Sequence, residues 1–240
     1  MSKILDVIIL AGGKGTRLSS SISDLPKPLA PVAGRPFLDY LVGFLASSKA
    51  GGRIIVSAGY KADKIHIWAA KQPEEPKIIV VDEKEPLGTG GALLHVFGEV
   101  QTTQTIVVMN GDSFVQLNLA DMIAHHKRAG VGLTIATTYV TDTARYGEVQ
   151  IVNDRIVAFG EKSSVHQPGW INAGVYLINK DVLATYPRGA CSFECDIIPR
   201  LLSSGIGAYP TQGAFIDIGT PESYAEAARV LQLGAANAVV

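Results

Sequence analysis

An aliphatic run close to the start of the chain gives way to a loop rich in glycine and positive charge. Positions 7–10 are all aliphatic, and the sequence then reads Ala11-Gly12-Gly13-Lys14-Gly15-Thr16-Arg17-Leu18. Glycines let a backbone turn tightly and bring its N–H groups close to an anion. Arginine adds a planar fork that suits phosphate oxygens. The pattern predicts a buried strand that opens into a polyphosphate-binding loop.

Three other interpretations of this loop fit less well. A P-loop needs G-x-x-x-x-G-K-[ST], which the chain lacks. A dinucleotide fingerprint needs G-x-G-x-x-G and an acidic residue about 20 positions on; here Leu18 stands at the third glycine, and no acid ends a second strand there. A plain tight turn without a ligand leaves three glycines and two cations in six residues unexplained. The loop therefore indicates a phosphate site of another class.

Composition limits the partners that the chain can have. Its 240 residues suit one domain, and the net charge of −1 predicts neither a nucleic-acid nor a membrane partner. Two cysteines are too few for a disulfide framework or a zinc site. We find no signal-peptide pattern and no run near the ~20 apolar residues of a membrane span. A soluble cytoplasmic protein is expected, and its oligomeric state stays open between monomer and homodimer.

The first half of the chain alternates between strand-like and helix-like segments. The strand-like runs are rich in isoleucine and valine without polar alternation, which is typical of a parallel sheet buried on both faces. Their alternation with amphipathic segments predicts an α/β fold with right-handed crossovers. The expected strands are 5–10, 53–58, 77–81 and 105–109. The expected helices begin with Pro36 in a first helical position and include 88–100 and 119–129.

The pattern changes after about residue 132. Strands are expected at 133–140, 148–152, 156–159 and 171–178, with Asn153-Asp154-Arg155 as the turn of a hairpin. Residues 193–202 look helical, and 215–219 are short and extended. Thr220-Pro221 fits the N-cap and first turn of a final helix. A parallel half (about 1–131) would carry a more antiparallel half (about 132–233), followed by a loose tail at 234–240.

Motifs over nearly the whole chain resemble those of the sugar-1-phosphate nucleotidyltransferases. After the opening loop come L-P-K-P-L at 25–29, E-P-L-G-T-G-G-A at 85–92, N-G-D at 110–112, R-Y-G at 145–147, E-K at 161–162, I-N-A-G-V-Y at 171–176 and F-I-D-I-G at 215–219. The resemblance implies one Rossmann-like, three-layer domain over 1–240, with a mostly parallel mixed sheet flanked by helices. The first half would bind the nucleotide and the second the sugar phosphate. The β-helix that many relatives carry after this domain is not expected.

The resemblance implies transfer of a nucleotidyl group from a nucleoside triphosphate to a sugar 1-phosphate, with release of pyrophosphate. A phosphate monoester loses its second proton near pH ~6, so the nucleophile needs no general base. It must approach a polyanion, and catalysis is then neutralisation and alignment. By resemblance the catalytic residues are Arg17, Lys27 and Asp112. The nucleotide-binding residues are Leu10, Ala11, Gly12, Gly13, Gly15, Thr16, Arg17, Glu85, Gly88, Thr89 and Gly111, and the sugar-phosphate-binding residues are Gly147, Glu161, Lys162 and Asn172.

Two aspartates are expected to hold one Mg²⁺. Asp112 follows a predicted parallel strand, and ligands bind at that end of open α/β sheets. Mg²⁺ takes one or two carboxylates together with phosphates and waters. Asp217, the second metal carboxylate by resemblance, lies between Ile216 and Ile218, where an acid needs a partner. The alternatives are that Asp112 caps a turn and that Asp217 is a hydrogen-bonded buried acid.

Glu85 favours GTP as the nucleotide. A carboxylate only accepts hydrogen bonds, and guanine offers N1–H beside an amino group, whereas uracil and thymine flank one N–H with carbonyls. Glu83 is close, so the register stays open. I-S-D-L-P-K-P at 22–28 and S-F-E at 192–194 resemble the branch that transfers GMP to D-glycero-α-D-manno-heptose 1-phosphate for bacterial capsule, lipopolysaccharide or S-layer glycans. Mannose 1-phosphate with GTP, or a hexose or N-acetyl sugar 1-phosphate with UTP, are the alternatives.

Two other classes of protein stay open beside the transferase. A catalytically silent sensor of sugar nucleotides could use the same fold, although it would not need to keep the metal carboxylates. A dinucleotide-dependent oxidoreductase is disfavoured by the missing third glycine.

Overall fold

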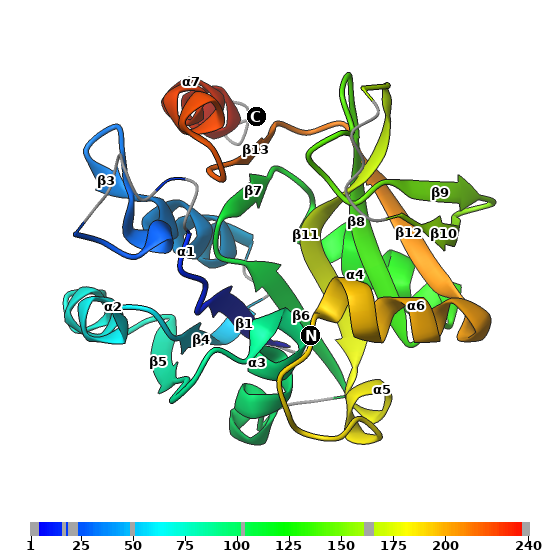
Figure 1. Ribbon diagram of the computed structural model, residues 1–240, viewed down its shortest axis with the longest axis horizontal. Helices are drawn as coiled ribbons and strands as arrows, with labels where there is room; N and C mark the ends of the chain where they lie inside the picture. Colours follow the sequence, from blue (N-terminus) through cyan, green and yellow to red (C-terminus); the bar gives the residue numbers. More distant parts are fainter. Residues whose placement is uncertain are drawn as a thin grey trace.

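A nine-stranded mixed sheet runs through the whole chain in the computed structural model, which describes residues 5–15, 18, 24–48, 51–101, 104–160 and 166–236. Figure 1 shows the sheet with helices on both sides. The strands lie side by side in the order β5 (Lys77–Asp82), β4 (Gly51–Ala58), β1 (Leu5–Ala11), β6 (Thr105–Asn110), β11 (Gly169–Asn179), β8 (Leu133–Val140), β12 (Ile206–Thr211), β10 (Arg155–Phe159) and β9 (Val149–Val152).

The first four strands of this order form the parallel part that the sequence predicts. Ile9 of β1 pairs with Val56 of β4 and with Met109 of β6, all in parallel register. The three side chains are almost completely buried, which explains why these strands show no polar alternation. Each predicted strand is confirmed, with its bounds shifted by no more than two residues.

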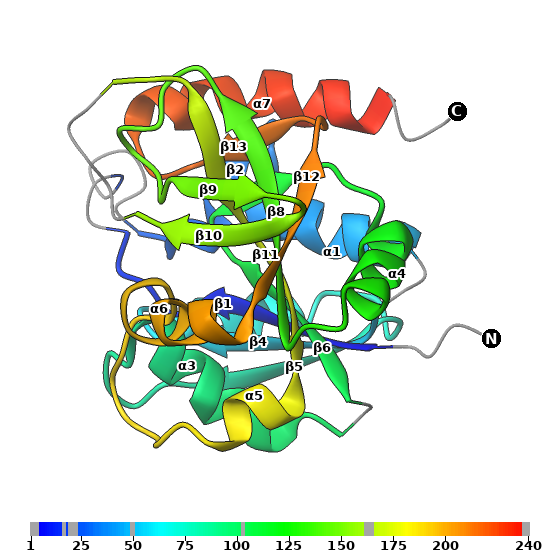
Figure 2. The ribbon, with the colours of Figure 1, turned by 90° about the vertical axis from the view of Figure 1, so that its right-hand side faces the viewer.

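Helices cover both faces of the sheet and complete three layers. One core packs α1 (Phe37–Ser48), α2 (Ala62–Ala69), α4 (Leu119–Ala129) and α7 (Pro221–Ala236) against one face, and the other packs α3 (Gly88–Val96), α5 (Lys180–Ala184) and α6 (Ile198–Leu201) against the opposite face. In Figure 2, α1 and α7 lie above β1, whereas α3 and α5 lie below it. The three-layer α/β fold is thus confirmed. Among the described residues, no helix has the length and apolarity to cross a membrane.

The second half is more antiparallel, as predicted, but it extends the same sheet. β11 runs antiparallel to both β6 and β8, and β9 and β10 form the predicted hairpin. Its turn residues Asn153 and Asp154 have φ of 49° and 57°, the left-handed values of a tight hairpin turn. β12 pairs in parallel with β8, and the sequence did not predict this strand. β7 (Ser113–Val115) and β13 (Phe215–Asp217) form a separate small sheet.

Three local predictions are wrong. Pro36 does not begin a helix: it pairs with Pro31 in a small hairpin of β2 (Pro31–Val32) and β3 (Arg35–Pro36), and α1 begins at Phe37. Residues 193–202 do not form one regular helix, because a wide helical turn (Phe193–Ile197) precedes α6 and a 3₁₀ turn (Leu202–Ser204) follows it. The expected loose tail is still helical at Gly234, since α7 runs to Ala236. Residues 237–240 lie outside the described part.

His126 on α4 is buried and forms hydrogen bonds through both ring nitrogens. Its Nε2 lies 3.1 Å from Asn179 Oδ1, an oxygen that also accepts from Thr105, so Nε2 must donate and Nδ1 accepts from Thr134. Burial lowers the pKa of His126, although the bond to Asn179 opposes this and nearby His125 and Lys127 support it. The unfolded chain therefore binds more protons than the folded one.

We expect the free energy of unfolding to fall as the pH drops below the ordinary histidine value near 6.5, by at most about 1.4 kcal/mol per pH unit from this group. His126→Gln is neutral at every pH and should flatten the profile between pH 7.5 and pH 5. Urea unfolding at several pH values measures this. An unchanged slope in the variant would show that other groups carry the acid sensitivity.

Candidate active site

Two adjoining cavities open at the ends of the parallel strands. The first, about 890 Å³, lies where β1, β4, β5 and β6 end, and we call it the nucleotide chamber. The second, about 670 Å³, lies beside β11 and the 145–147 segment, and we call it the acceptor chamber. Ligands of open α/β sheets bind at this end of the strands. The residues that line both chambers are Lys27, Thr89, Asn110, Asp112 and Gly219.

The glycine-rich loop forms one wall of the nucleotide chamber, and two of its glycines lie close to side chains of other segments. A Cβ on Gly12 would lie 2.1 Å from Glu83 Oε1, and one on Gly15 would lie 2.9 Å from the Lys27 side chain. Gly15 also has φ of 59°, which side chains disfavour. The loop can therefore pack directly against Glu83 and Lys27. Thr16 and Arg17, expected in the same loop, lie outside the described residues.

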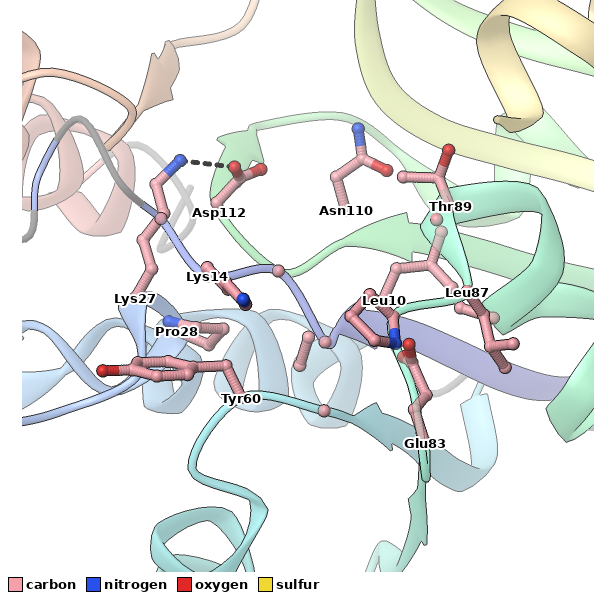
Figure 3. A pocket seen from close by; sticks show the side chains of 18 of the residues that line it. Leu10, Lys14, Lys27, Pro28, Tyr60, Glu83, Leu87, Thr89, Asn110 and Asp112 are labelled. Atoms are coloured by element: carbon pink, nitrogen blue, oxygen red, sulfur yellow. Dashed lines mark hydrogen bonds and ion pairs between the residues drawn. The ribbon is translucent and has the colours of Figure 1, made fainter. Parts of the chain in front are cut away.

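Lys27 and Asp112 meet at the boundary between the two chambers. Lys27 Nζ lies 2.5 Å from Asp112 Oδ2, and their side chains are 12% and 44% exposed. Lys27 begins a short 3₁₀ turn (Lys27–Leu29). It lies between Pro26 and Pro28, whose rings restrict the backbone around it. Figure 3 shows the two side chains pointing toward each other, with Lys14 and Asn110 nearby. A mostly buried cation thus lies beside a partly exposed carboxylate.

Asp217 is held by several donors on the acceptor side. Arg145 Nη2 lies 3.1 Å from both of its carboxylate oxygens, Tyr146 donates from its hydroxyl at 2.7 Å, and the Gly219 N–H donates at 2.8 Å. Burial and the neighbouring Asp217 raise the pKa of Tyr146 well above its ordinary value, so this hydroxyl keeps its proton. The sequence predicts that this acid needs a partner, and Arg145, Tyr146 and the Gly219 N–H are its partners in the protein.

The arrangement of the two aspartates suits a magnesium ion shared with phosphates better than a site made of protein alone. Within the described part of the chain, no three His, Cys, Asp or Glu side chains gather around one point. A Cβ on Gly219 would lie 2.6 Å from Asp217 Oδ1 and 3.5 Å from Lys27 Nζ, and the same Lys27 Nζ bonds to Asp112 Oδ2, so Lys27 lies beside the surroundings of both acids. Mg²⁺ typically uses one or two carboxylates with phosphates and waters. The donor set therefore fits, provided that Arg145 leaves Asp217.

Two carboxylates lie on the segment where the base is expected. Glu83 accepts a hydrogen bond from the buried Ser57 hydroxyl at 2.9 Å and lies against Gly12, whereas Glu85 is exposed. Both line the nucleotide chamber together with Tyr60. Figure 3 shows Glu83 below Leu10 at the far end of the chamber from Lys27. Of the two carboxylates between which the sequence could not choose, Glu83 is held by Ser57 and Glu85 is exposed.

Long-range contacts join the base segment to the second half of the chain. The Cys191 carbonyl accepts from the N–H groups of Gly90 and Gly91 at the start of α3. A Cβ on Gly88, whose φ is 70°, would lie 2.6 Å from the same carbonyl oxygen. Thr89 donates to Glu194 at 2.6 Å and accepts from the Phe193 N–H at 2.9 Å. Thr89 and Glu194 therefore link the two chambers.

The acceptor chamber is built around a bulge in β11. Regular pairing with β8 is interrupted between Asn172 and Tyr176, where Gly174 has φ of 77°. Such bulges redirect side chains and occur next to active sites. Asn172 Nδ2 donates to the hydroxyl of the buried Tyr176, which donates in turn to Glu194. Asn110 Oδ1 is buried without a hydrogen-bond partner among the described residues.

Most of the predicted site residues come together in these chambers. Glu161 and Lys162 lie outside the described residues, as do Thr16 and Arg17. Gly111 does not line a chamber; it supports the loop by donating from its N–H to the Leu10 carbonyl. The nucleotide chamber contains Leu10, Ala11, Gly12, Gly13, Gly15, Lys27, Glu85, Gly88, Thr89 and Asp112, and the acceptor chamber contains Gly147, Asn172 and Asp217. Roles for Asn110, Arg145 and Tyr146 were not predicted, although all three lie within the quoted motifs, and Glu83 entered the sequence analysis only as the alternative to Glu85.

This fold and site define a nucleotidyl transferase. Residues 6–233 match the sequence profile of the Nucleotidyl transferase family, and the chain belongs to that family. It is similar to the D-glycero-alpha-D-manno-heptose 1-phosphate guanylyltransferase of Aneurinibacillus thermoaerophilus, with 36% identity over 95% of this chain and 99% of that protein. The mannose-1-phosphate guanylyltransferase of Mycobacterium tuberculosis is 33% identical over 97% of this chain and 66% of its own length.

A solved structure shows the same similarity in three dimensions. The crystal structure of HddC from Yersinia pseudotuberculosis has a TM-score of 0.83 and 36% sequence identity, covering 94% of this chain and 99% of that one. HddC has also been crystallised in complex with GMP-PN. The predicted family and fold class are thus confirmed.

Proposed function

We propose that the protein transfers GMP from GTP to D-glycero-α-D-manno-heptose 1-phosphate, giving GDP-heptose and pyrophosphate. The observation that carries this proposal is the pair of chambers that meet at Lys27 and Asp112. A nucleotide in one chamber and a sugar phosphate in the other would place their phosphates at this boundary. The reaction would take place in the cytoplasm, where GTP is available, and the product would serve bacterial surface polysaccharides.

The chemistry follows from charge and alignment. A phosphate oxygen of the sugar attacks the α-phosphorus of GTP, the bond to the bridging oxygen of the β-phosphate breaks, and pyrophosphate leaves. Because nucleophile and substrate are both anions, fixed cations reduce their repulsion in the approach and in the transition state. Lys27 is positioned for this role, and Arg17 is proposed for the leaving pyrophosphate. Lys162 and Glu161 are proposed to bind the phosphate and hydroxyls of the sugar.

Mg²⁺ is proposed as the cofactor, held by Asp112 and Asp217. When bound, it would neutralise phosphate charge and fix the geometry of the transfer. Asp112 is accessible from both chambers, and its present partner Lys27 can turn to phosphate oxygens. Asp217 lies against Gly219, a residue that lines both chambers.

Carboxylates on the base segment are proposed to select guanine. We expect Glu83→Gln to lower the preference for GTP over UTP by about tenfold or more, because the bond to an ionised acceptor is stronger than that to an amide. Glu85→Gln should have a smaller effect, since Glu85 is exposed and Glu83 is held by Ser57. The ratio of kcat/KM values for the two nucleotides measures the effect. If the preference survives in both variants, carboxylates do not read the base.

Whole-chain similarity supports heptose over mannose as the acceptor sugar. The heptose 1-phosphate guanylyltransferase of Aneurinibacillus thermoaerophilus is 36% identical to this chain, and the mannose-1-phosphate guanylyltransferase of Mycobacterium tuberculosis is 33% identical. A pyrophosphate-release assay over four nucleoside triphosphates and several sugar 1-phosphates tests the proposal. GTP with heptose 1-phosphate should give the highest kcat/KM. A higher value with mannose 1-phosphate, or with UTP, would replace the substrate and leave the reaction class intact.

A further inference from the structure

Arg145 lies where a second cation would have to approach Asp217. Its Nη2 is 3.1 Å from each carboxylate oxygen and 3.2 Å from the Ser223 hydroxyl. With Tyr146 and the Gly219 N–H on the same carboxylate, Asp217 already accepts from three groups. These contacts use about as many lone pairs as a carboxylate has. A divalent cation that binds Asp217 therefore has to displace a donor, and Arg145 is the donor that carries a positive charge.

The guanidinium of Arg145 is incompletely bonded in this position. Arginine has five N–H donors, yet Nη2 makes all three of the hydrogen bonds just described. Nε is buried without a hydrogen-bond partner among the described residues. The side chain is 38% exposed and lines the acceptor chamber. A phosphate in that chamber would offer several oxygens to the unused donors, in the forked geometry that arginine favours.

Charge balance favours a change of partner. Each of the two aspartates has its own cation, Lys27 on Asp112 and Arg145 on Asp217. The four charges cancel, which suits a site without metal. A divalent cation that takes both carboxylates leaves an excess of two positive charges on the protein groups and the metal. That excess suits the dianionic phosphate of a sugar 1-phosphate.

We propose that Arg145 changes partner in the reaction cycle: it neutralises Asp217 while no metal is bound, and it binds the phosphate of the sugar 1-phosphate once a divalent cation takes Asp217. The proposal rests on the proposed function, because it assumes a metal-dependent transferase. It differs from a purely structural role, in which Arg145 orients Asp217 for the metal.

Metal binding without nucleotide or sugar tests the first half. We expect Arg145→Met to bind Mn²⁺ about twofold to fivefold more tightly than the unmodified protein, because it removes a competing cation of the strength seen in partly exposed ion pairs. The concentration of free Mn²⁺, measured by electron paramagnetic resonance during titration, gives the affinity. Arg145→Gln removes the same charge and keeps an amide donor, so it should also bind more tightly. Arg229→Gln on α7 is the control, since Arg229 is exposed, pairs with Glu226 and lines neither chamber.

Binding of the acceptor tests the second half. With Mn²⁺ and α,β-methylene-GTP bound, calorimetry should show that Arg145→Met binds heptose 1-phosphate at least tenfold more weakly, and mannose 1-phosphate likewise. Weaker or unchanged Mn²⁺ binding in both Arg145 variants, or no Mn²⁺ binding to them at millimolar concentration, would overturn the proposal. Sugar-phosphate affinity within twofold of the unmodified protein would overturn it as well. The Mn²⁺ titration contains no substrate, so its result does not depend on transferase activity. Mn²⁺ binding can contradict the proposal for Arg145 while the protein is an active transferase, and it can support the proposal while no transfer is found.

Discussion

Lys27→Met is expected to lower kcat/KM for transfer by about a thousandfold, the order found when a fixed cation or donor at a transition state is removed. Among the described residues, Lys27 is the positively charged side chain that lines both chambers, and its Nζ lies 2.5 Å from Asp112 Oδ2. Without Lys27, the attacking and leaving phosphates lose a positive charge that is already in position before the reaction begins. Steady-state rates of pyrophosphate release measure the effect.

Stability should change little in the same variant, because Asp112 is 44% exposed and water can solvate it. Thermal unfolding separates the loss of activity from a loss of folding. Lys127→Met is the matched control, since Lys127 is exposed on α4 and lines neither chamber. Activity within threefold of normal in Lys27→Met would remove Lys27 from the catalytic machinery.

Asp112→Asn is expected to lower turnover at limiting Mg²⁺ by about a hundredfold or more, since metal contributions to charge neutralisation amount to several kcal/mol. Raising the Mg²⁺ concentration should recover part of the loss, because the amide keeps one oxygen toward the metal. Asp217→Asn should behave in the same way. A titration of initial rate against Mg²⁺ gives both the maximal rate and the metal requirement.

Asp217→Asn also weakens the bonds to Arg145 and Tyr146, so its stability has to be measured beside its activity. Asp121→Asn on α4 is a suitable comparison, because Asp121 bonds to Tyr209 outside both chambers. Near-normal turnover at limiting Mg²⁺ in either site variant would contradict a metal shared by the two aspartates.

Local patterns predict the elements of this fold better than they predict the contacts between them. The apolar runs around Ile9 and Val107 indicate strands buried on both faces, and the structure confirms this. The β12 strand was not predicted, because Gly207 and Pro210 interrupt its pattern. α2 was not predicted either, since it has eight residues and only Ile65 and Trp68 are buried. Short elements of this kind are stabilised by tertiary packing rather than by their own sequence.

Site residues were predicted where a motif contains them, and missed where the role arises from distant contacts. The bond from Thr89 to Glu194 joins residues 105 positions apart, and the pair of Arg145 and Asp217 spans 72 positions. No periodicity or spacing indicates such pairs. The sequence identified Asp217 as an acid that needs a partner, but only the structure shows that Arg145 and Tyr146 supply one. Glu83 was noted for its proximity, and its bond to Ser57 distinguishes it from Glu85.

The most direct test of the proposed chemistry is to identify the products from GTP and D-glycero-α-D-manno-heptose 1-phosphate in the presence of Mg²⁺. Phosphorus nuclear magnetic resonance should show GDP-heptose and pyrophosphate appearing in equal amounts, with no orthophosphate. Intact GTP after prolonged incubation, despite measurable binding of both ligands, would indicate a sensor on a transferase fold. Orthophosphate with GDP, and no sugar nucleotide, would contradict transfer at the α-phosphorus.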